Sequence, residues 1–539
     1  MWAMSKESRY ERPLMGPSLD ERIGADHGIR LLDEILQDVD WSPWEAIYAC
    51  THAGRPPIHP RLMAGAILYG LCKGLHSTRA LEEATRMRLD FQWFLDGLLI
   101  DHTTFCVFRK RFGTQIQELF KQLNRQSAAL KQVTLEELII DGTRMRSNSD
   151  RHGARTADSL EARLVIVEQK IAEGLHQLGE EEDAIPEELS SEALQSRLHL
   201  LEEQRRKLQS ALEVARERDE VKRQREGANS TPVRVPVTDP ESSILPNKEG
   251  GYAPNYTPVV AVSPEGVILG TVIADGNAEA ATVVELVDQV SDLHEESGPV
   301  KWVLADGGFA SGENFAYMEQ AGIEFYTPVV VSGSCAGPAA SETASEPVPT
   351  KGGKLGREAF LYDAESNAYQ CPEGRTLPLW RTTTRKSRSG VDVQVQEYRC
   401  LDCSDCPLAQ RCLKGKAKRR MISRDAYEPC RERASARMAT DEGQQIYRRR
   451  APVVEGVIGR IKASMGVRQF RRRGKINVGI EWVWICTAFN LKKRIKGGAP
   501  SSPKKRTKKQ YPAIYRAWKA ILPFASQPNP CFACQPLEA

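Results

Sequence analysis

The chain has 539 residues, a formal net charge of +4 and a hydrophobic content of 41%. This length exceeds what one hydrophobic core supports, so we expect several domains of about 150 residues each. The longest nearly uncharged apolar stretches, residues 62–72 and 483–491, are shorter than the roughly 20 residues of a membrane helix, and the N-terminus has no apolar secretion segment. We therefore expect a cytoplasmic protein without a membrane span.

Residues 1–130 have the pattern of a helical domain. Apolar residues recur at helical spacing in residues 59–74, and a second helix is expected over residues 78–89. Asp101 is a suitable N-cap for a third helix that ends near residue 112. We predict a compact helical domain here.

A helical arm is expected between Asp158 and Glu226. Aliphatic residues recur there at steps of three and four, on either side of the polar stretch 179–188. This pattern is typical of a helical hairpin or a short coiled coil. We interpret it as a solvated arm, inserted into the fold, with no chemistry of its own.

Strand patterns lie on either side of the arm. The expected elements are strands over residues 135–141, 257–262 and 267–274, a helix over 279–293 and a strand over 300–306. The first strand ends at Asp141 and the last at Asp306. The order predicts an α/β sheet with an acid at the C-terminal end of its first and fourth strands.

The remainder of the chain is rich in cysteine and then in basic residues. Residues 331–353 are small, polar and rich in proline and glycine, which indicates a linker. From Ile446 to Tyr511 there are 19 lysines and arginines against two acids. Such a block favours a nucleic-acid partner, although a solvated basic tail is the alternative.

Asp141 and Asp306 are candidate metal ligands. Open sheets bind ligands at the carboxyl ends of their strands. Two carboxylates held close together repel each other unless a divalent cation lies between them, which points to Mg²⁺ or Mn²⁺. Each aspartate also precedes a glycine, so either of them could simply close a turn.

A third acid, Glu455, lies in a helix that we expect to begin near Pro452. The apolar stripe of this helix consists of Val454, Ile458, Ile461 and Met465. Glu455 borders that stripe, and Lys462, seven residues later, returns to the same face as Glu455. We expect a carboxylate at the edge of the sheet with a cation about two turns away.

The three acids resemble the DDE triad of bacterial insertion-sequence transposases. The motifs are IIDGT around Asp141, VLADGGFA around Asp306 and YRRRAPVVEGVIGRIK around Glu455. Residues 17–36, 54–84 and 101–112 resemble the N-terminal helical domain in one branch of these enzymes. The resemblance covers most of residues 15–495.

The chain departs from the pattern of that family in two places. Four residues separate Arg450 from Glu455, where related transposases often have three, so whether Arg448, Arg449 or Arg450 faces DNA stays open. The arm at 158–226 also makes the gap between the two aspartates long, although loops tolerate insertions at little cost.

The resemblance implies an α/β fold with an RNase H-like catalytic core. The implied domains are an N-terminal all-α, DNA-binding domain (1–130), the first part of the core with the arm inserted at about 158–226 (131–330), a Cys-rich, zinc-stabilised β insertion (331–445), the C-terminal helices of the core (446–497) and a basic, proline-rich tail (498–539).

The resemblance also implies phosphoryl transfer at DNA with two Mg²⁺ (or Mn²⁺) ions per active site. Asp141 would bridge both ions, and Asp306 and Glu455 would each hold one. Water would cut the ends of the element, and the freed 3′-hydroxyl would then attack target DNA. A transposase that holds two DNA ends is expected to be a homodimer associated with the nucleoid.

Six cations are candidate DNA contacts. Contacts to phosphates position DNA without reading its sequence and weaken steeply with salt. The RRRG segment could instead be a solvated turn. The six residues are Arg450, Lys462, Arg468, Arg471, Arg472 and Arg473.

Five cysteines are candidate zinc ligands. The 13 cysteines of the chain are an odd number, which argues against a disulfide framework. Short CxxC steps suit tetrahedral Zn²⁺, which would stabilise the β insertion, with an iron–sulfur cluster or free thiols as alternatives. The five candidates for four positions are Cys371, Cys400, Cys403, Cys406 and Cys412.

Two other functions are compatible with the sequence. A nuclease, or an inactive transposase-derived DNA-binding regulator, would share the helical domain and the basic block. A non-enzymatic, zinc-stabilised scaffold would use the arm to bind partners, and its three acids would then be turn residues.

Overall fold

A computed structural model describes most of the chain. The described residues are 2–4, 8–13, 16–48, 56–182, 188–227, 230–247, 250–293, 299–329, 331, 333–334, 349–350, 353–387, 390–413 and 415–497. No helix in these ranges is long and apolar enough to cross a membrane. The expected tail at 498–539 lies outside them.

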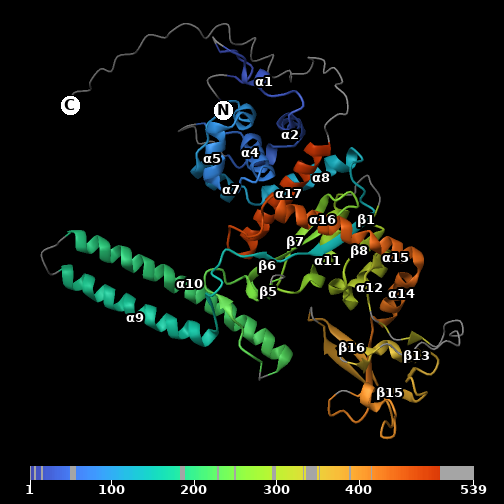
Figure 1. The fold of residues 1–539 in the computed structure, drawn as a ribbon. Coiled ribbons are helices and arrows are strands. Elements are labelled where there is room, and N and C mark those ends of the chain that lie inside the picture. Colours follow the sequence, from blue (N-terminus) through green and yellow to red (C-terminus); the bar gives the residue numbers. More distant parts are fainter. Residues whose placement is uncertain are drawn as a thin grey trace, which may run out of the picture.

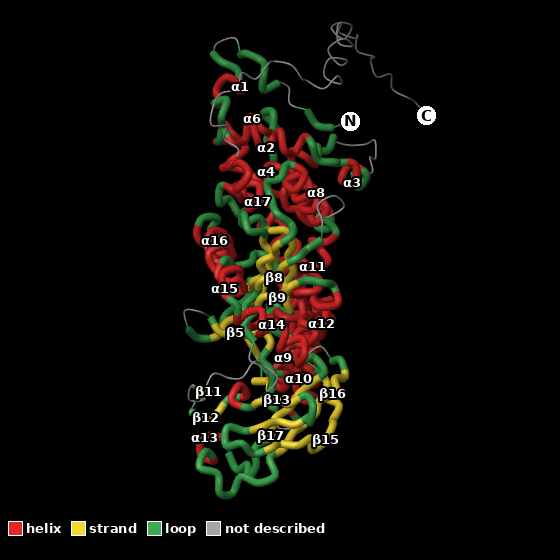
Figure 2. The backbone as a smooth tube through the Cα atoms, turned by 90° about the vertical axis from the view of Figure 1, so that its right-hand side faces the viewer, coloured by secondary structure: helices red, strands yellow, loops and turns green. Residues whose placement is uncertain are grey.

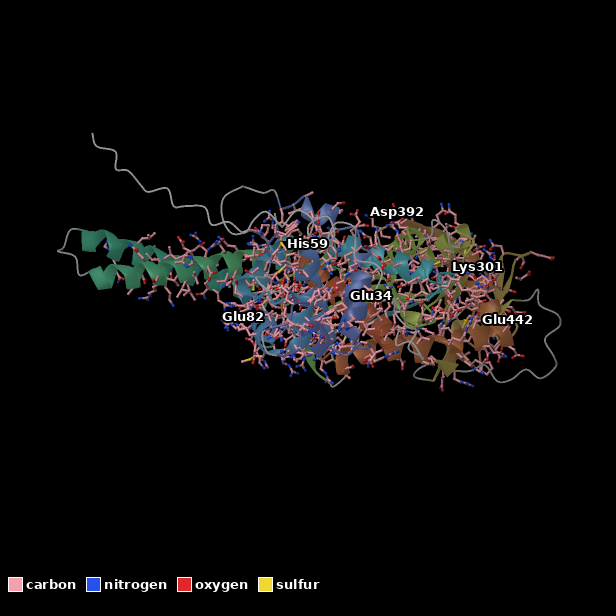
Figure 3. The ribbon with its side chains drawn as sticks, turned by 90° about the horizontal axis from the view of Figure 1, so that it is seen from above. Glu34, His59, Glu82, Lys301, Asp392 and Glu442 are labelled. Atoms are coloured by element: carbon pink, nitrogen blue, oxygen red, sulfur yellow. The ribbon has the colours of Figure 1, made fainter. Side chains whose placement is uncertain are left out.

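The molecule is elongated, with helices at one end and a β-rich region at the other (Figures 1 and 2). A central sheet lies between these ends, and a two-helix arm projects to one side. Seen from above, the arm stands clear of the body (Figure 3). In that view His59 and Glu82, from the N-terminal helices, lie nearer to the arm than Lys301 and Glu442 do.

The N-terminal part is helical, as predicted. Asp101 caps its helix as expected, because its Oδ1 accepts a hydrogen bond from the backbone N–H of Thr104 at 2.8 Å. The helices share one hydrophobic core with the C-terminal helix α17 (Lys475–Gly497), which packs on α2, α4 and α8. Their bounds are α1 Leu19–Arg22, α2 Gly28–Gln37, α3 Ser42–Glu45, α4 Pro60–Cys72, α5 Thr78–Met87, α6 Leu89–Phe94, α7 His102–Arg111 and α8 Gln115–Ala129.

The central sheet has seven strands in the order β2-β6-β1-β8-β9, with β5 and β7 also paired to β6. The predicted β6–β7 hairpin is confirmed, and β1 is antiparallel to β6 but parallel to β8. The strands are β1 Glu137–Gly142, β2 Met145–Arg146, β5 Ser243–Pro246, β6 Tyr252–Val262, β7 Ile268–Ala274, β8 Trp302–Leu304 and β9 Glu324–Tyr326.

Helices cover both faces of this sheet. Alternate residues of β1 point to opposite faces: Leu138 and Ile140 pack in the cluster that contains α11 and α12, whereas Ile139 packs in the cluster that contains α16 and α17. The helices are η1 Glu279–Thr282, α11 Val283–Ser291, η2 Gly307–Phe309, α12 Gly312–Gln320, α14 Glu428–Ala439, α15 Asp441–Arg448 and α16 Arg450–Ala463.

Two helix predictions need correction. The helix expected over 279–293 begins with a turn of 3₁₀-helix, and α11 starts only at Val283. In α16 the fully buried stripe contains Val457, whereas Ile458 is only partly buried. The physical reason is that α16 crosses the sheet with the Val454, Val457 and Ile461 face against β1, which rotates Ile458 outward.

The predicted arm is confirmed as two helices, α9 (Ala157–Glu182) and α10 (Glu188–Glu226). Their aliphatic residues form a separate small core. The arm leaves and rejoins the body through one short antiparallel pair, β3 (Ala154–Arg155) with β4 (Val235–Pro236).

The cysteine-bearing segment forms a second sheet of six strands in the order β10-β13-β14-β15-β16-β17. Most of the expected linker at 331–353 lies outside the described residues. The elements are β10 Gly333–Ser334, β11 Pro349–Thr350, β12 Lys354–Leu355, η3 Arg357–Ala359, β13 Leu361–Asp363, β14 Ala368–Gln370, β15 Thr376–Lys386, β16 Asp392–Arg399, α13 Ala409–Cys412 and β17 Met421–Asp425.

Candidate active site

The two predicted aspartates meet at one edge of the central sheet. Strands β1 and β8 are parallel neighbours, and Ile139 pairs with Leu304. Continuing this register by two residues brings Asp141 opposite Asp306. The two acids therefore lie side by side because each follows its strand at the same edge.

Arg450, at the start of α16, joins the two carboxylates. Its Nη2 lies 3.1 Å from Oδ1 of Asp141 and 3.8 Å from Oδ2 of Asp306. Arg450 is buried, the Asp141 side chain is 16% exposed and the Asp306 side chain is 45% exposed. One buried cation thus compensates two acids, of which Asp306 is the one open to solvent.

The loop after β8 fixes the orientation of Asp306. Its Oδ1 accepts a hydrogen bond from the backbone N–H of Gly308 at 2.8 Å, which starts the η2 turn. The Thr327 hydroxyl donates to the Asp306 carbonyl oxygen at 2.8 Å. These contacts leave Oδ2 directed toward Arg450.

Glu455 lies on α16, which packs on β1, and its side chain is exposed. It makes no hydrogen bond or ion pair with any described residue. Lys462, on the same face of α16, donates to Oγ1 of Thr143 at 2.5 Å and to the Arg144 carbonyl oxygen at 3.0 Å. That face of the helix therefore borders the chain just beyond Asp141, but only the two aspartates are joined through Arg450.

A fourth acid, Glu279, lies at the same edge and was not predicted. A Cβ atom on Gly142 would lie 2.8 Å from Oε2 of Glu279, so the glycine makes room for this carboxylate. Burial raises the pKa of Glu279, and the negative charges of Asp306 and Asp141 raise it further. The sequence signal was an acid at the start of the helix after β7, but nothing in it indicated proximity to Gly142.

The structure gives different surroundings to the three arginines left open by the sequence. Arg450 is buried against the aspartates, so its predicted DNA contact is not seen and stays a prediction. Arg449 lies 3.0 Å from Oε2 of Glu137. Arg448 is exposed and has no ion pair within the described part of the chain.

The predicted basic residues after α16 form a loop beside β2. Arg468, Arg471 and Arg473 are exposed and Arg472 is half-buried. Nε of Arg473 donates to the Asn148 carbonyl oxygen at 2.8 Å, which ties the loop to the chain that follows β2. This loop therefore lies close to the strand path that carries Asp141.

The five predicted cysteines gather around one small core. Cys400, Cys403 and Cys412 are buried there, and Cys371 packs against them. Burial raises the pKa of the Cys400 thiol to about 11, and a hydrogen bond with Cys403 contributes. Burial raises the pKa of the Cys412 thiol, and the charge of the nearby Cys406 contributes to the increase. All five are free thiols.

Neither cluster has the arrangement of a ready metal site. Among the residues that the structure describes, no three His, Cys, Asp or Glu side chains are grouped so as to hold an ion. The cysteine arrangement therefore does not support the predicted structural zinc. At the sheet edge, the Arg450 guanidinium occupies the space between the two carboxylates, whose oxygens are the donors that Mg²⁺ prefers.

Two family models match the chain. Residues 370–495 match the family described as Transposase DDE domain, a range that contains Glu455 and the five cysteines but neither aspartate. Residues 17–111 match the family described as Transposase domain (DUF772). Comparison with curated proteins and with solved structures gave no match.

Proposed function

We propose that in this chain, which the two domain matches identify as an insertion-sequence transposase of the DDE type, Asp141, Asp306 and Glu455 are the catalytic triad. The enzyme cleaves DNA and transfers strands, and its family generally uses divalent metals such as Mg²⁺. The observation that carries the assignment is the pair of aspartates on adjacent parallel strands, joined by one arginine.

The proposed core is RNase H-like and comprises residues 131–330 and 446–497. Its support is the topology: an antiparallel β1, β6 and β7 unit, followed by α11 and then by β8 parallel to β1. The helical domain at 1–130, the arm at about 158–226 and the β insertion at 331–445 would be additions to that core. Strand transfer at two DNA ends favours a homodimer associated with the nucleoid.

The acids have distinct proposed roles. Asp141, the less exposed aspartate, would hold both ions, and Asp306 and Glu455 would each hold one. When bound, the ions lower the pKa of the attacking hydroxyl and stabilise the leaving oxygen. Until then Arg450 offsets part of the negative charge of the two aspartates, and ions that bind between them would compete with its guanidinium for these oxygens.

Lys462 and Arg468 would position the DNA backbone. Lys462 is held by Thr143 and Arg144, two and three residues beyond Asp141. A phosphate neutralised there would lie along the strand that ends at the proposed metal site. Arg471, Arg472 and Arg473 would extend this basic path.

Substitution of one acid tests the proposal. Asp306→Asn should stop Mg²⁺-dependent cleavage of DNA that contains the element ends, while leaving folding and end binding nearly unchanged. Asp275→Asn is the matched control, because Asp275 also precedes a glycine after a strand of the same sheet, yet it pairs with Lys475. Cleavage by Asp306→Asn at the parent's rate would refute the triad.

The joining step separates a transposase from a nuclease. A 3′-hydroxyl end incubated with a target plasmid should become covalently joined to it by the parent enzyme. Asp306→Asn should give no joined product.

A zinc ion held by four of the five cysteines is a separate proposal. It rests on the short CxxC steps of the sequence, because the described thiols do not form a ready site. Zinc would have to displace thiol protons, so binding should weaken as pH falls. Metal analysis of the purified chain tests it: less than about half a zinc ion per chain would exclude a structural site.

A further inference from the structure

A basic cavity lies between the N-terminal helices and the loop that follows α16. Its volume is about 670 Å³, within the range of ordinary ligand sites. Helices α4 and α7 contribute one wall, and the loop at 466–472 with α17 contributes the other. The charged residues that line it are His76, Arg109, Arg468, Arg471, Arg472 and Glu481.

Arg109 is a partly buried cation of this cavity. Its Nε and Nη2 atoms are shielded from solvent and have no hydrogen-bond partner among the described residues. Burial, together with the neighbouring positive charge of Arg472, lowers the pKa of Arg109 to about 10. Buried charges are normally paired, so this guanidinium lacks the anion that its environment requires.

The one acid among the described residues that line the cavity, Glu481, meets this need only in part, because its charge acts on Arg109 without a direct contact. Glu481 accepts hydrogen bonds from the backbone N–H groups of Arg471 at 3.1 Å and Arg472 at 2.9 Å. Its carboxylate therefore holds the loop in place and makes no ion pair with Arg109. His76 donates from Nε2 to the Met465 carbonyl oxygen at 2.7 Å and is likewise engaged with the loop.

We infer that this cavity binds a phosphate group of DNA, with Arg109 as the buried guanidinium that receives it. A guanidinium matches phosphate through two parallel hydrogen bonds and is less strongly hydrated than an ammonium group. Arg468, Arg471 and Arg472 surround the same space and add positive charge. The inference rests on the proposed function, because a transposase brings DNA to this face.

The cavity is linked to the proposed active site by the chain itself. Asn148 lines the cavity, seven residues after Asp141, and the loop pairs with β2 through Arg146 and Gln469. Seven residues span at most roughly 25 Å, about seven nucleotides along one DNA strand. A strand that is cut at Asp141 can therefore reach Arg109, and the cavity would fix the N-terminal domain to the same DNA.

Inorganic phosphate tests the site without DNA or metal. In EDTA, with phosphate exchanged for chloride at constant ionic strength, the Tm of the parent chain should rise and saturate. Arg109→Met should start at the parent's Tm or above it, because an unpaired buried charge has been removed, and should not respond to phosphate. Lys110→Met, at the exposed next position of α7, should respond as the parent does.

Two results would overturn the inference. One is a parent chain with no phosphate response beyond that of chloride. The other is Arg109→Met with a lowered Tm and an intact phosphate response, which would make Arg109 a purely structural residue.

Binding of DNA identifies the source of the phosphate. In the Asp306→Asn background, Arg109→Met should weaken duplex binding about tenfold and reduce the salt dependence by about one phosphate contact. If Arg109→Met loses the same affinity for duplexes with and without a 5′-phosphate, the cavity binds a backbone phosphate. If it loses affinity only for the phosphorylated duplex, the cavity binds the terminal phosphate. Affinity equal to that of Lys110→Met would refute DNA as the ligand.

The catalytic triad and the phosphate site at Arg109 are tested by independent results. The phosphate response requires neither cleavage nor metal, so it holds even if Asp306→Asn proves active. Conversely, an inactive Asp306→Asn protein with no phosphate response would leave the triad intact and remove the cavity.

Discussion

The acidic sheet edge and the basic cavity differ in whether their charged side chains form ion pairs. At the edge, Asp141 and Asp306 share a buried counter-ion, Arg450. In the cavity, Arg109 forms no ion pair with a described residue, because the carboxylate of Glu481 accepts hydrogen bonds from backbone N–H groups and acts on Arg109 only through its charge. The edge therefore holds one positive charge against two negative ones before any ligand arrives, whereas the cavity has an excess of positive charge. A cation must compete with Arg450 for the edge, whereas an anion meets no competitor in the cavity.

The largest expected effect comes from Asp141 at the edge. Asp141→Asn should reduce cleavage by at least roughly 10³-fold, since it would lose a ligand shared by both ions. It should also lower the free energy of unfolding by about 3 kcal/mol, because it breaks a buried ion pair with Arg450. Urea unfolding in EDTA measures the second effect.

Asp306 provides the matched control for that stability change. Its side chain is nearly half exposed, so Asp306→Asn should change the free energy of unfolding by less than about 1 kcal/mol. Equal losses in the free energy of unfolding for Asp141→Asn and Asp306→Asn would show that Arg450 stabilises both aspartates to the same extent.

Arginine substitutions should sharpen the contrast between the two regions. Arg450→Met should lower the free energy of unfolding by about 3 kcal/mol in EDTA, because two acids lose their cation, and millimolar Mg²⁺ should restore much of it. Thermal unfolding with and without Mg²⁺ measures this. Arg472→Met, in the cavity, removes a half-buried cation with no ion pair to a described residue and should show neither effect.

The next largest effect is expected for substitution of Glu481, which holds the loop of the cavity. Glu481→Gln keeps the size of the side chain but weakens its hydrogen bonds to the backbone of Arg471 and Arg472. We expect a loss of about 1–2 kcal/mol in the free energy of unfolding and a weaker phosphate response. If the phosphate response instead became stronger, Glu481 would be a competitor of the anion and not a support of the loop.

The smallest effects are pH dependences of opposite sign. The pKa of Glu279 is raised above 4.5, so its stabilising contribution is complete below pH 4.5 and is lost as pH rises through the folded value. The pKa of His76 is lowered below 6.5 by burial, so its contribution is present above pH 6.5 and is lost as pH falls through the folded value.

Unfolding in EDTA between pH 4 and 7 separates these two groups. In the parent chain, Glu279 should make the free energy of unfolding fall as pH rises, and His76 should make it increase. Glu279→Gln should abolish the first dependence, and His76→Gln the second. Parallel pH profiles for the parent and both variants would show that neither group titrates differently in the folded chain.

The sequence predicted the parts of this molecule that depend on local patterns. Periodicity alone indicated the arm, the hairpin and the strand ends at Asp141 and Asp306, because buried faces impose a period of two or 3.6 residues. Short strands such as β2 and β9 carry too few residues to show a period. The sequence placed Ile458, and not Val457, in the buried stripe of α16. Both residues are apolar and adjacent, so the sequence did not determine which of them faces the sheet.

Contacts between distant residues could not be predicted in this way. Glu279 lies beside Gly142, and Arg450 between two aspartates, through tertiary packing across more than a hundred residues. The sequence left open which of Arg448, Arg449 and Arg450 faces DNA, and only the structure shows that Arg450 is buried. Arg109 gave no signal, because an arginine at the end of an amphipathic helix is an ordinary solvent-facing residue.

The narrow junction of the arm has a mechanical consequence. Helix α9 has 26 residues and so extends about 39 Å, and the arm is held at its base by the β3–β4 pair and by Arg218 of α10, which donates to the carbonyl oxygens of Glu241 and Ser242. A lever of that length converts a rotation of only ten degrees at its base into a displacement of roughly 7 Å at its tip. Small twists in the backbone near Ala154 and Pro236, combined with release of the two Arg218 contacts, would move the tip of the arm by a distance comparable to the width of a DNA groove.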